Sequence, residues 1–335
     1  MHLIWNIRST ARVCSEKSQN KKGKIKAKQM KNKKLYGNIV LLITAILWGS
    51  AFIAQEVAMD SIGSFAFQAA RSFVGCIFLT PVIMILDARK KKSPDYKPPT
   101  REDKKTFMHA ALICGILLCI ASNLQQLGIE KGTSGGKAGF ITAFYMLLVP
   151  IFSLIMGKKI SPLVFPCVVL ALGGLYMLCM KGESGVSLGD LLVLACSVFF
   201  AVRIMATSRY ATRVDNIRLA RAQFLICGVV SLILAIIFES FDAKALLEAL
   251  PAILYAGIFS SGIAYTLEIV GQKYTDPTVA SMLMSLESVF AVLTGMIVLH
   301  DMPSASEWIG SAMMLISVII VQLPIGKLFK KKKGT

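Results

Sequence analysis

Charged residues are scarce in this sequence. Charged residues make up 17% of its 335 positions, whereas hydrophobic residues make up 55% and the mean hydropathy is +0.64. A soluble globule needs more polar surface than this composition supplies. We therefore exclude a soluble fold and expect segments that cross a bilayer.

Residues and motifs typical of enzymes are also scarce. The three histidines, His2, His109 and His300, lie in the N-terminal tail or at the ends of apolar segments. No CxxC or acidic metal-binding motif occurs, so we predict no catalytic site, metal or cofactor. No GxxxxGK[ST] sequence occurs either, so any transport must draw on gradients rather than ATP. Seven of the eight cysteines fall within apolar segments, where we expect buried, reduced thiols.

Apolar segments fill most of the remaining sequence. A helix rises ~1.5 Å per residue, so roughly 20 residues cross ~30 Å of hydrocarbon. We predict an all-α polytopic membrane protein with ten transmembrane helices, and we single out three charges within them as candidates for function: Arg71, Arg203 and Glu287. The predicted spans are at about 36–58, 64–86, 107–129, 135–157, 161–180, 187–208, 219–238, 248–270, 277–299 and 306–325.

The positive charge has a strongly uneven distribution. The net charge is +18, and nearly all of the 37 Lys and Arg fall on one side of the predicted spans. By the positive-inside rule, both termini are cytoplasmic in a multi-pass protein of the cell membrane. We assign Arg89–Lys92 and Lys330–Lys333 to topology signals that also contact anionic lipids at the cytoplasmic face, and we predict no nucleic-acid partner.

The two ends of the chain are basic tails. Residues 1–34 are predicted to be a disordered cytoplasmic tail, and residues 326–335 form a second basic tail. Met30 directly precedes Lys31–Lys34, an ordinary lead-in to a first span, which suggests that translation starts at Met30.

The two parts between the tails, 35–180 and 187–325, repeat each other. An offset of 152 places Gly37-Asn38 on Gly189-Asp190 and Arg71 on Gln223. Five spans followed by five spans put the two copies in opposite orientations. Such an inverted repeat is the usual construction of a secondary transporter.

Several motifs resemble the EamA family of the drug/metabolite transporter superfamily over about residues 36–325. The stretch 123–150 (NLQQLGIEKGTSGGKAGFITAFYMLLVP) resembles the family's third-to-fourth-span motif, and WGSAF at 48–52, FQAAR at 67–71 and SMLMSLESVF at 281–290 resemble its first, second and ninth spans. The resemblance implies two inverted five-helix halves and the export of small metabolites or amino acids. The chain has Ser288 where the family often has Pro, which argues against a kink there.

The three intramembrane charges are the first candidates for function. An ionised Glu287 costs at least a few kcal/mol at mid-membrane unless it is paired or hydrated, so we assign it a proton-coupling role, with a structural hydrogen bond as the alternative. Arg71 matches the family's second-span arginine; it either contacts a substrate carboxylate or a gate, or bonds backbone carbonyls. Arg203 is expected to snorkel to the cytoplasmic surface.

Aromatic and polar side chains complete the predicted site. Trp48, Phe52 and Gln55 share one helix face, which suits an amphipathic ligand or, alternatively, plain helix packing. The polar residues of spans three and nine either line a cavity or form interhelical hydrogen bonds. The predicted substrate-binding residues are Trp48, Phe52, Gln55, Arg71, Asn123, Gln126, Tyr145, Tyr265, Ser281 and Ser285, with Glu287 as the proton-coupling residue.

Taken together, these features predict a secondary transporter. We expect it to export small amphipathic metabolites such as amino acids by alternating access, with proton coupling through Glu287. Cationic drug efflux, relying on Glu287 and aromatic side chains, is an alternative. A non-transporting scaffold or receptor is an alternative of another class. The expected partners are a small-molecule substrate and the bilayer, and a homodimer is one compatible assembly.

Overall fold

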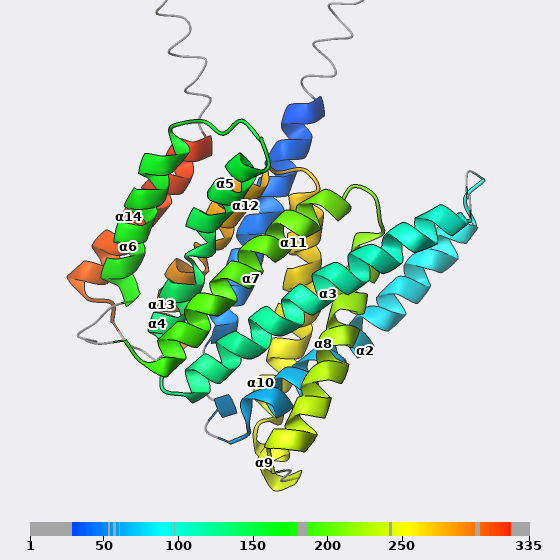
Figure 1. The fold of residues 1–335 in the computed structure, drawn as a ribbon, viewed down its shortest axis with the longest axis horizontal. Helices are drawn as coiled ribbons and strands as arrows, with labels where there is room; N and C mark the ends of the chain where they lie inside the picture. Colours follow the sequence, from blue (N-terminus) through cyan, green and yellow to red (C-terminus); the bar gives the residue numbers. More distant parts are fainter. Residues whose placement is uncertain are drawn as a thin grey trace, which may run out of the picture.

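The computed structural model describes residues 29–322 except positions 53, 56–57, 60, 95, 97, 134, 180–185, 241–242 and 299–301. Over these residues the chain forms helices and no β-strand (Figure 1), which confirms the all-α prediction for this part. Residues 1–28 and 326–335 of the predicted tails lie outside the described residues. The start of the first helix and the end of α14 lie at the same end of the molecule (Figure 1).

The first helix, Gln29–Phe52, is called the N-terminal helix here. The elements that follow are α2 (Ser64–Lys91), α3 (Arg101–Glu130), α4 (Gly135–Thr142), α5 (Tyr145–Ile155), α6 (Val164–Cys179), α7 (Leu188–Tyr210), α8 (Asn216–Phe238), α9 (Ala243–Glu248), α10 (Leu250–Tyr255), the π-helix η1 (Ala256–Ala264), α11 (Tyr265–Gln272), α12 (Pro277–Met284), α13 (Glu287–Val298) and α14 (Ala305–Gln322).

Eight of the described helical segments are long and apolar enough to cross a membrane, and α6 and α14 are shorter apolar helices. Three of the eight are made of consecutive elements: Lys137–Ile155, Leu250–Gln272 and Pro277–Ile297. Residues 29–34, predicted as part of the tail, form exposed helical turns instead. The lysines there are good helix formers, so the helix extends beyond its apolar part.

Two of these segments are interrupted near their middle. One interruption lies at residues 143–144, between α4 and α5, and the other at residues 285–286, between α12 and α13. The second interruption lies close to Ser288, although the proline that the family often has there is absent. Tighter turns carry the chain across each interruption: Phe144 N donates to Ile141 O in the first, and Leu286 N donates to Leu283 O in the second.

The same close helix crossing occurs twice, once at each end of the molecule. Gly37 lies against Gly271, and Gly189 lies against Gly128, so closely that an added Cβ at Gly189 would be 2.5 Å from the Gly128 carbonyl oxygen. A threonine closes each crossing: Thr275 Oγ1 donates to Asn38 at 3.0 Å, and Thr133 Oγ1 donates to Asp190 at 3.0 Å. Glycine is needed at these positions because the two backbones touch.

Antiparallel helices α2 and α8 are joined at both ends. At one end the Glu239 carboxylate accepts from the α2 backbone amides of Phe65 (2.8 Å) and Ala66 (2.9 Å), in the manner of a helix cap. At the other end Arg218 pairs with Asp87, and Lys90 pairs with Asp215 at 2.5 Å. Burial opposes the ionisation of Asp215, but hydrogen bonds from Lys90 and from the Arg218 backbone outweigh it and hold the pKa of this carboxyl below its usual value.

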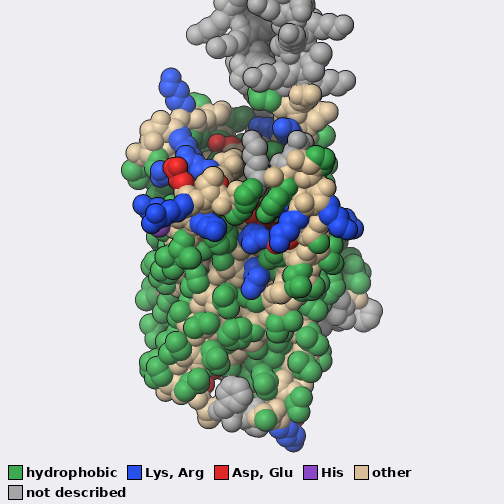
Figure 2. Space-filling view, turned by 90° about the vertical axis from the view of Figure 1, so that its right-hand side faces the viewer, with side chains coloured by type: hydrophobic (Ala, Val, Ile, Leu, Met, Phe, Trp, Pro, Cys, Tyr) green, Lys and Arg blue, Asp and Glu red, His purple; other side chains and the backbone are tan. Residues whose placement is uncertain are grey.

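The surface agrees with a protein embedded in a bilayer. Figure 2 shows Lys and Arg side chains gathered toward one end of the visible face and hydrophobic side chains over most of the rest. The exposed large hydrophobic residues come from many helices, as a lipid-facing surface requires. Buried, free thiols are found at Cys76, Cys114, Cys119, Cys167, Cys196 and Cys227, as predicted.

Candidate functional site

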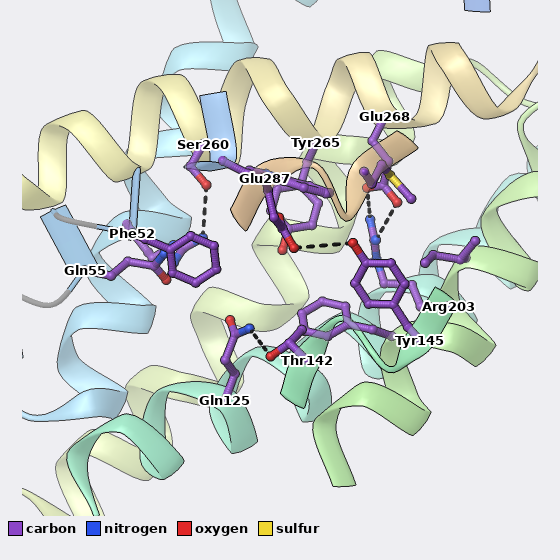
Figure 3. A pocket seen from close by; sticks show the side chains of 15 residues that line it. Phe52, Gln55, Gln125, Thr142, Tyr145, Arg203, Ser260, Tyr265, Glu268 and Glu287 are labelled. Atoms are coloured by element: carbon purple, nitrogen blue, oxygen red, sulfur yellow. Dashed lines mark hydrogen bonds and ion pairs between the residues drawn. The ribbon is translucent and has the colours of Figure 1, made fainter. Parts of the chain in front are cut away.

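A small pocket, with a cavity volume of about 40 Å³, lies among the helices, and both halves of the chain contribute to its walls. It contains all three predicted intramembrane charges. The side chains that line it are Trp48, Phe52, Gln55, Arg71, Gln125, Thr142, Tyr145, Phe200, Arg203, Ile204, Ser260, Tyr265, Glu268, Met284 and Glu287. Figure 3 shows Glu287 between Gln55 and Ser260 on one side and the Arg203–Glu268 pair on the other.

Arg71 is a buried cation held by neutral acceptors. Its guanidinium donates to Gln55 Oε1 at 2.7 Å, to Ser261 Oγ at 3.3 Å and to Ser260 Oγ at 3.4 Å. These contacts use three of its five N–H groups. Among the described residues it forms no ion pair, and its acceptors are side chains rather than the backbone carbonyls considered above. A charge this deeply buried (4% exposed) is costly without a counter-charge, so an anionic ligand group would stabilise it.

The π-helix η1 explains how two adjacent serines reach the same guanidinium. In an α-helix, neighbouring side chains point about 100° apart, and the wider π-helical turn reduces this angle. Ser260 and Ser261 both lie within η1, and their hydroxyls both accept from Arg71. Gly257 permits the close approach, because an added Cβ there would be 2.5 Å from Val74.

Glu287 is the first residue of α13, directly after the helix interruption. Its carboxylate accepts one long hydrogen bond, from Tyr145 Oη at 3.3 Å, and its side chain is nearly completely buried. Tyr145 is the first residue of α5, directly after the corresponding interruption in the first half. The two interrupted helices therefore present an acid and a phenol to each other. Among the described residues, Glu287 has no cationic partner.

The prediction that Arg203 snorkels to the cytoplasmic surface is wrong. Its side chain is 1% exposed and donates through Nη1 and Nη2 to the two carboxylate oxygens of Glu268, both at 2.9 Å. Gln223 accepts from Arg203 Nε at 3.1 Å, and Gln272 donates to Glu268 at 2.9 Å. The guanidinium also lies over the Tyr265 ring, 4.9 Å from its centroid. A carboxylate on a neighbouring helix provides a nearer and stronger partner than the membrane surface.

Aromatic rings connect this ion pair to the first helix. The Tyr265 ring packs edge-on against Trp48, with centroids 4.7 Å apart, and against Phe224 at 5.1 Å. The structure thus places Trp48, Phe52, Gln55, Arg71, Tyr145, Tyr265 and Glu287, all predicted from the sequence, around one pocket.

Four of the predicted residues do not line the pocket. Asn123 exchanges hydrogen bonds with Ser231 between α3 and α8 (2.8 Å and 3.0 Å). Ser281 and Ser285 donate to carbonyls of their own helical segment, those of Thr278 and Met282. Gln126 is buried away from the pocket. Asn123 thus matches the alternative of an interhelical hydrogen bond, whereas Ser281 and Ser285 bond within their own helical segment, and Gln126 Nε2 has no hydrogen-bond partner among the described residues.

Gln125, the residue before Gln126, lines the pocket instead of Gln126 and donates to Thr142 at 2.8 Å. Sequence reasoning also missed Ser260, Phe200, Ile204 and Met284 as lining residues. A signal did exist for the Arg203–Glu268 pair, because these are opposite charges within two apolar segments.

A bundle of membrane-length helices with an internal, charged pocket is typical of a membrane transporter. A model of the EamA-like transporter family matches residues 35–180 and again residues 187–323, and the chain belongs to this family. It is 30% identical to an uncharacterized transporter of Archaeoglobus fulgidus over 88% of each chain. It is 25% identical to the uncharacterized inner membrane transporter YedA of Escherichia coli K12, over 86% of this chain and 90% of that one.

A protein of known crystal structure has the same fold. The two superpose with a TM-score of 0.70 at 18% identity, covering 89% of this chain and 99% of the other. At this identity the likeness concerns the fold alone.

Proposed function

We propose that this chain is a secondary transporter that exports small amphipathic metabolites of the amino-acid type by alternating access, with Glu287 as its proton-coupling group. The observation that carries this proposal is a pocket with one buried cation and one buried carboxylate that lack ion partners among the described residues. An amino-acid zwitterion would supply both, with its carboxylate at Arg71 and its ammonium at Glu287. The neighbouring rings of Phe52 and Tyr265 offer apolar contact for its side chain.

The alternatives fit the pocket less well. A cationic drug would bind at Glu287 but would meet the positive charge of Arg71 in the same pocket, and like charges in a buried site repel strongly. A scaffold or receptor would not need a charged interior, which is costly to maintain in a membrane.

Three matched probes test the proposal in proteoliposomes. L-leucine has both charges, 4-methylpentanoate lacks the ammonium and 3-methylbutylamine lacks the carboxylate. We expect saturable uptake of radiolabelled L-leucine, weaker competition by 4-methylpentanoate and the weakest by 3-methylbutylamine, because Arg71 repels the amine. Preferred uptake of the amine would favour cationic efflux. No uptake of any probe by sealed proteoliposomes that contain the folded protein would contradict the proposal.

We further propose ten crossings in two inverted halves with cytoplasmic termini. The family model matches twice, and each match contains five predicted spans; an odd number of crossings reverses the second copy. The shorter helices α6 and α14 supply the fifth crossing of each half, and they pack closely enough that an added Cβ on Gly174 would be 2.6 Å from the Gly310 carbonyl oxygen.

Cysteine labelling tests this topology. On a background without the eight native cysteines, Ser93→Cys should react with a membrane-impermeant thiol reagent from the cytoplasmic side, and Lys244→Cys from the outside. Both positions are exposed, so lack of access does not limit the reaction. Reaction of both positions from the same side would refute the inverted arrangement.

A further inference from the structure

The Arg203–Glu268 pair lies between the pocket and the basic end of the molecule. Glu268 is four residues from the end of α11 and Arg203 seven residues from the end of α7, which corresponds to ~6 Å and ~10 Å of helix. The loops beyond these ends contain Arg213 and Lys273. The pair is part of the pocket lining and lies toward these loops. On this side, the pocket is therefore bounded by an ion pair.

The pair belongs to a continuous buried layer. Gln223 and Gln272 bond its two members, and the Tyr265 ring covers the guanidinium. These residues come from α7, α8 and α11, all in the second half of the chain. On the α7, α8 and α11 side of the pocket, this layer separates the pocket from the basic end.

We propose that the Arg203–Glu268 pair is the cytoplasmic gate of the transporter. The assignment rests on the proposed function and on the cytoplasmic position of the basic end. When the layer is closed, each charge has its counter-charge. When it opens, water hydrates both charges and offsets the lost attraction. A layer of apolar side chains would gain no such compensation, because its opening exposes hydrophobic area to water. An ion pair therefore allows a gate that is sealed and still able to open.

Two substitutions have opposite expected effects. Glu268→Gln leaves Arg203 without a counter-charge and should draw water into the layer from the cytoplasm. The paired change Arg203→Met with Glu268→Leu keeps side-chain volume, removes both charges and should hold the gate closed. If the ion pair had only a structural role, the paired change to Met and Leu would leave transport at the parental level, because replacing a buried ion pair by apolar side chains is often neutral for stability.

Access to a cysteine in the pocket measures the gate directly. Thr142→Cys on the cysteine-free background is the reporter, and a charged, membrane-impermeant methanethiosulfonate reagent is applied to vesicles of each orientation. We expect Glu268→Gln to accelerate labelling from the cytoplasmic side by about tenfold or more. The apolar pair should reduce this labelling below that of the parent, keep labelling from the outside and slow L-leucine exchange.

Asp87→Asn is the matched control, because it breaks an ion pair with Arg218 at the same end but away from the pocket. It should label like the parent. Unchanged cytoplasmic labelling in Glu268→Gln, or parental exchange rates in the apolar pair, would overturn the gate. If the Glu268→Gln protein does not fold, labelling of the Arg203→Met, Glu268→Leu protein from the cytoplasmic side tests the gate. Labelling needs no transported substrate, so the absence of L-leucine uptake would refute the proposed function without affecting this result.

Discussion

Glu287→Gln should reduce transport driven by a pH gradient to the level of protein-free liposomes, while L-leucine exchange persists with a weakened apparent affinity because the substrate ammonium loses its counter-charge. The amide has the size of the acid and can still accept from Tyr145 Oη, which contacts Glu287 at 3.3 Å. It cannot take up or release a proton, so net movement loses its driving ion, while weaker binding of substrate in both states still supports exchange. The measurement is L-leucine flux with and without a pH gradient, followed by exchange of labelled for unlabelled L-leucine.

Tyr145→Phe is the matched control for this change. It removes the hydrogen bond to Glu287 and keeps the ring and the acid, so gradient-driven transport should survive with an altered rate. A Glu287→Gln protein whose net transport retains the parental pH dependence would end the proton-coupling role of Glu287.

Arg71→Lys should weaken the apparent affinity for L-leucine by about tenfold or more, because charge-assisted hydrogen bonds contribute ~1.5–3 kcal/mol each. Lysine keeps the charge but replaces a planar fork of donors by one ammonium, which cannot reach Gln55, Ser260 and a ligand carboxylate in the same geometry. Competition by 3-methylbutylamine, which has no carboxylate, should change little. Apparent affinity and maximal flux are measured after normalisation to the amount of protein in the membrane.

Arg218→Lys controls for the substitution itself, since Arg218 pairs with Asp87 outside the pocket. Its L-leucine affinity should stay at the parental value. Gln223, the repeat counterpart of Arg71, is unsuitable as a control because it accepts from Arg203 in the proposed gate. An Arg71→Lys protein with parental affinity for L-leucine would remove Arg71 from the substrate site.

The sequence was sufficient to predict the helical class and the main charges of the pocket. An apolar run of about 20 residues has few structures available in a bilayer, and a charge within it must face the protein interior. Arg71 and Glu287 were identifiable for that reason. The face formed by Trp48, Phe52 and Gln55 was identifiable because helical periodicity is regular.

What remained beyond the sequence was the rotation of each helix about its axis and the choice of partner. Gln125 and Gln126 are adjacent, and a rotation of about 100° decides which of them faces the pocket. In a helix that is apolar on every side, periodicity does not determine that angle. The interruptions at residues 143–144 and 285–286 contain no proline or glycine, so no local residue predicted them.

The double attachment of α2 to α8 has a consequence for the ligand itself. Arg71 sits on a helix fastened to its neighbour at both ends, by Glu239 at one and by Asp87 and Lys90 at the other. Glu287 instead follows a point where its helix is interrupted. The wall of the pocket formed by α2 is thus rigid, and the wall formed by α12 and α13 can bend at the interruption. A molecule that binds both Arg71 and Glu287 connects α2 with the interrupted helix. The length of that molecule then sets the angle that α13 can adopt relative to α2.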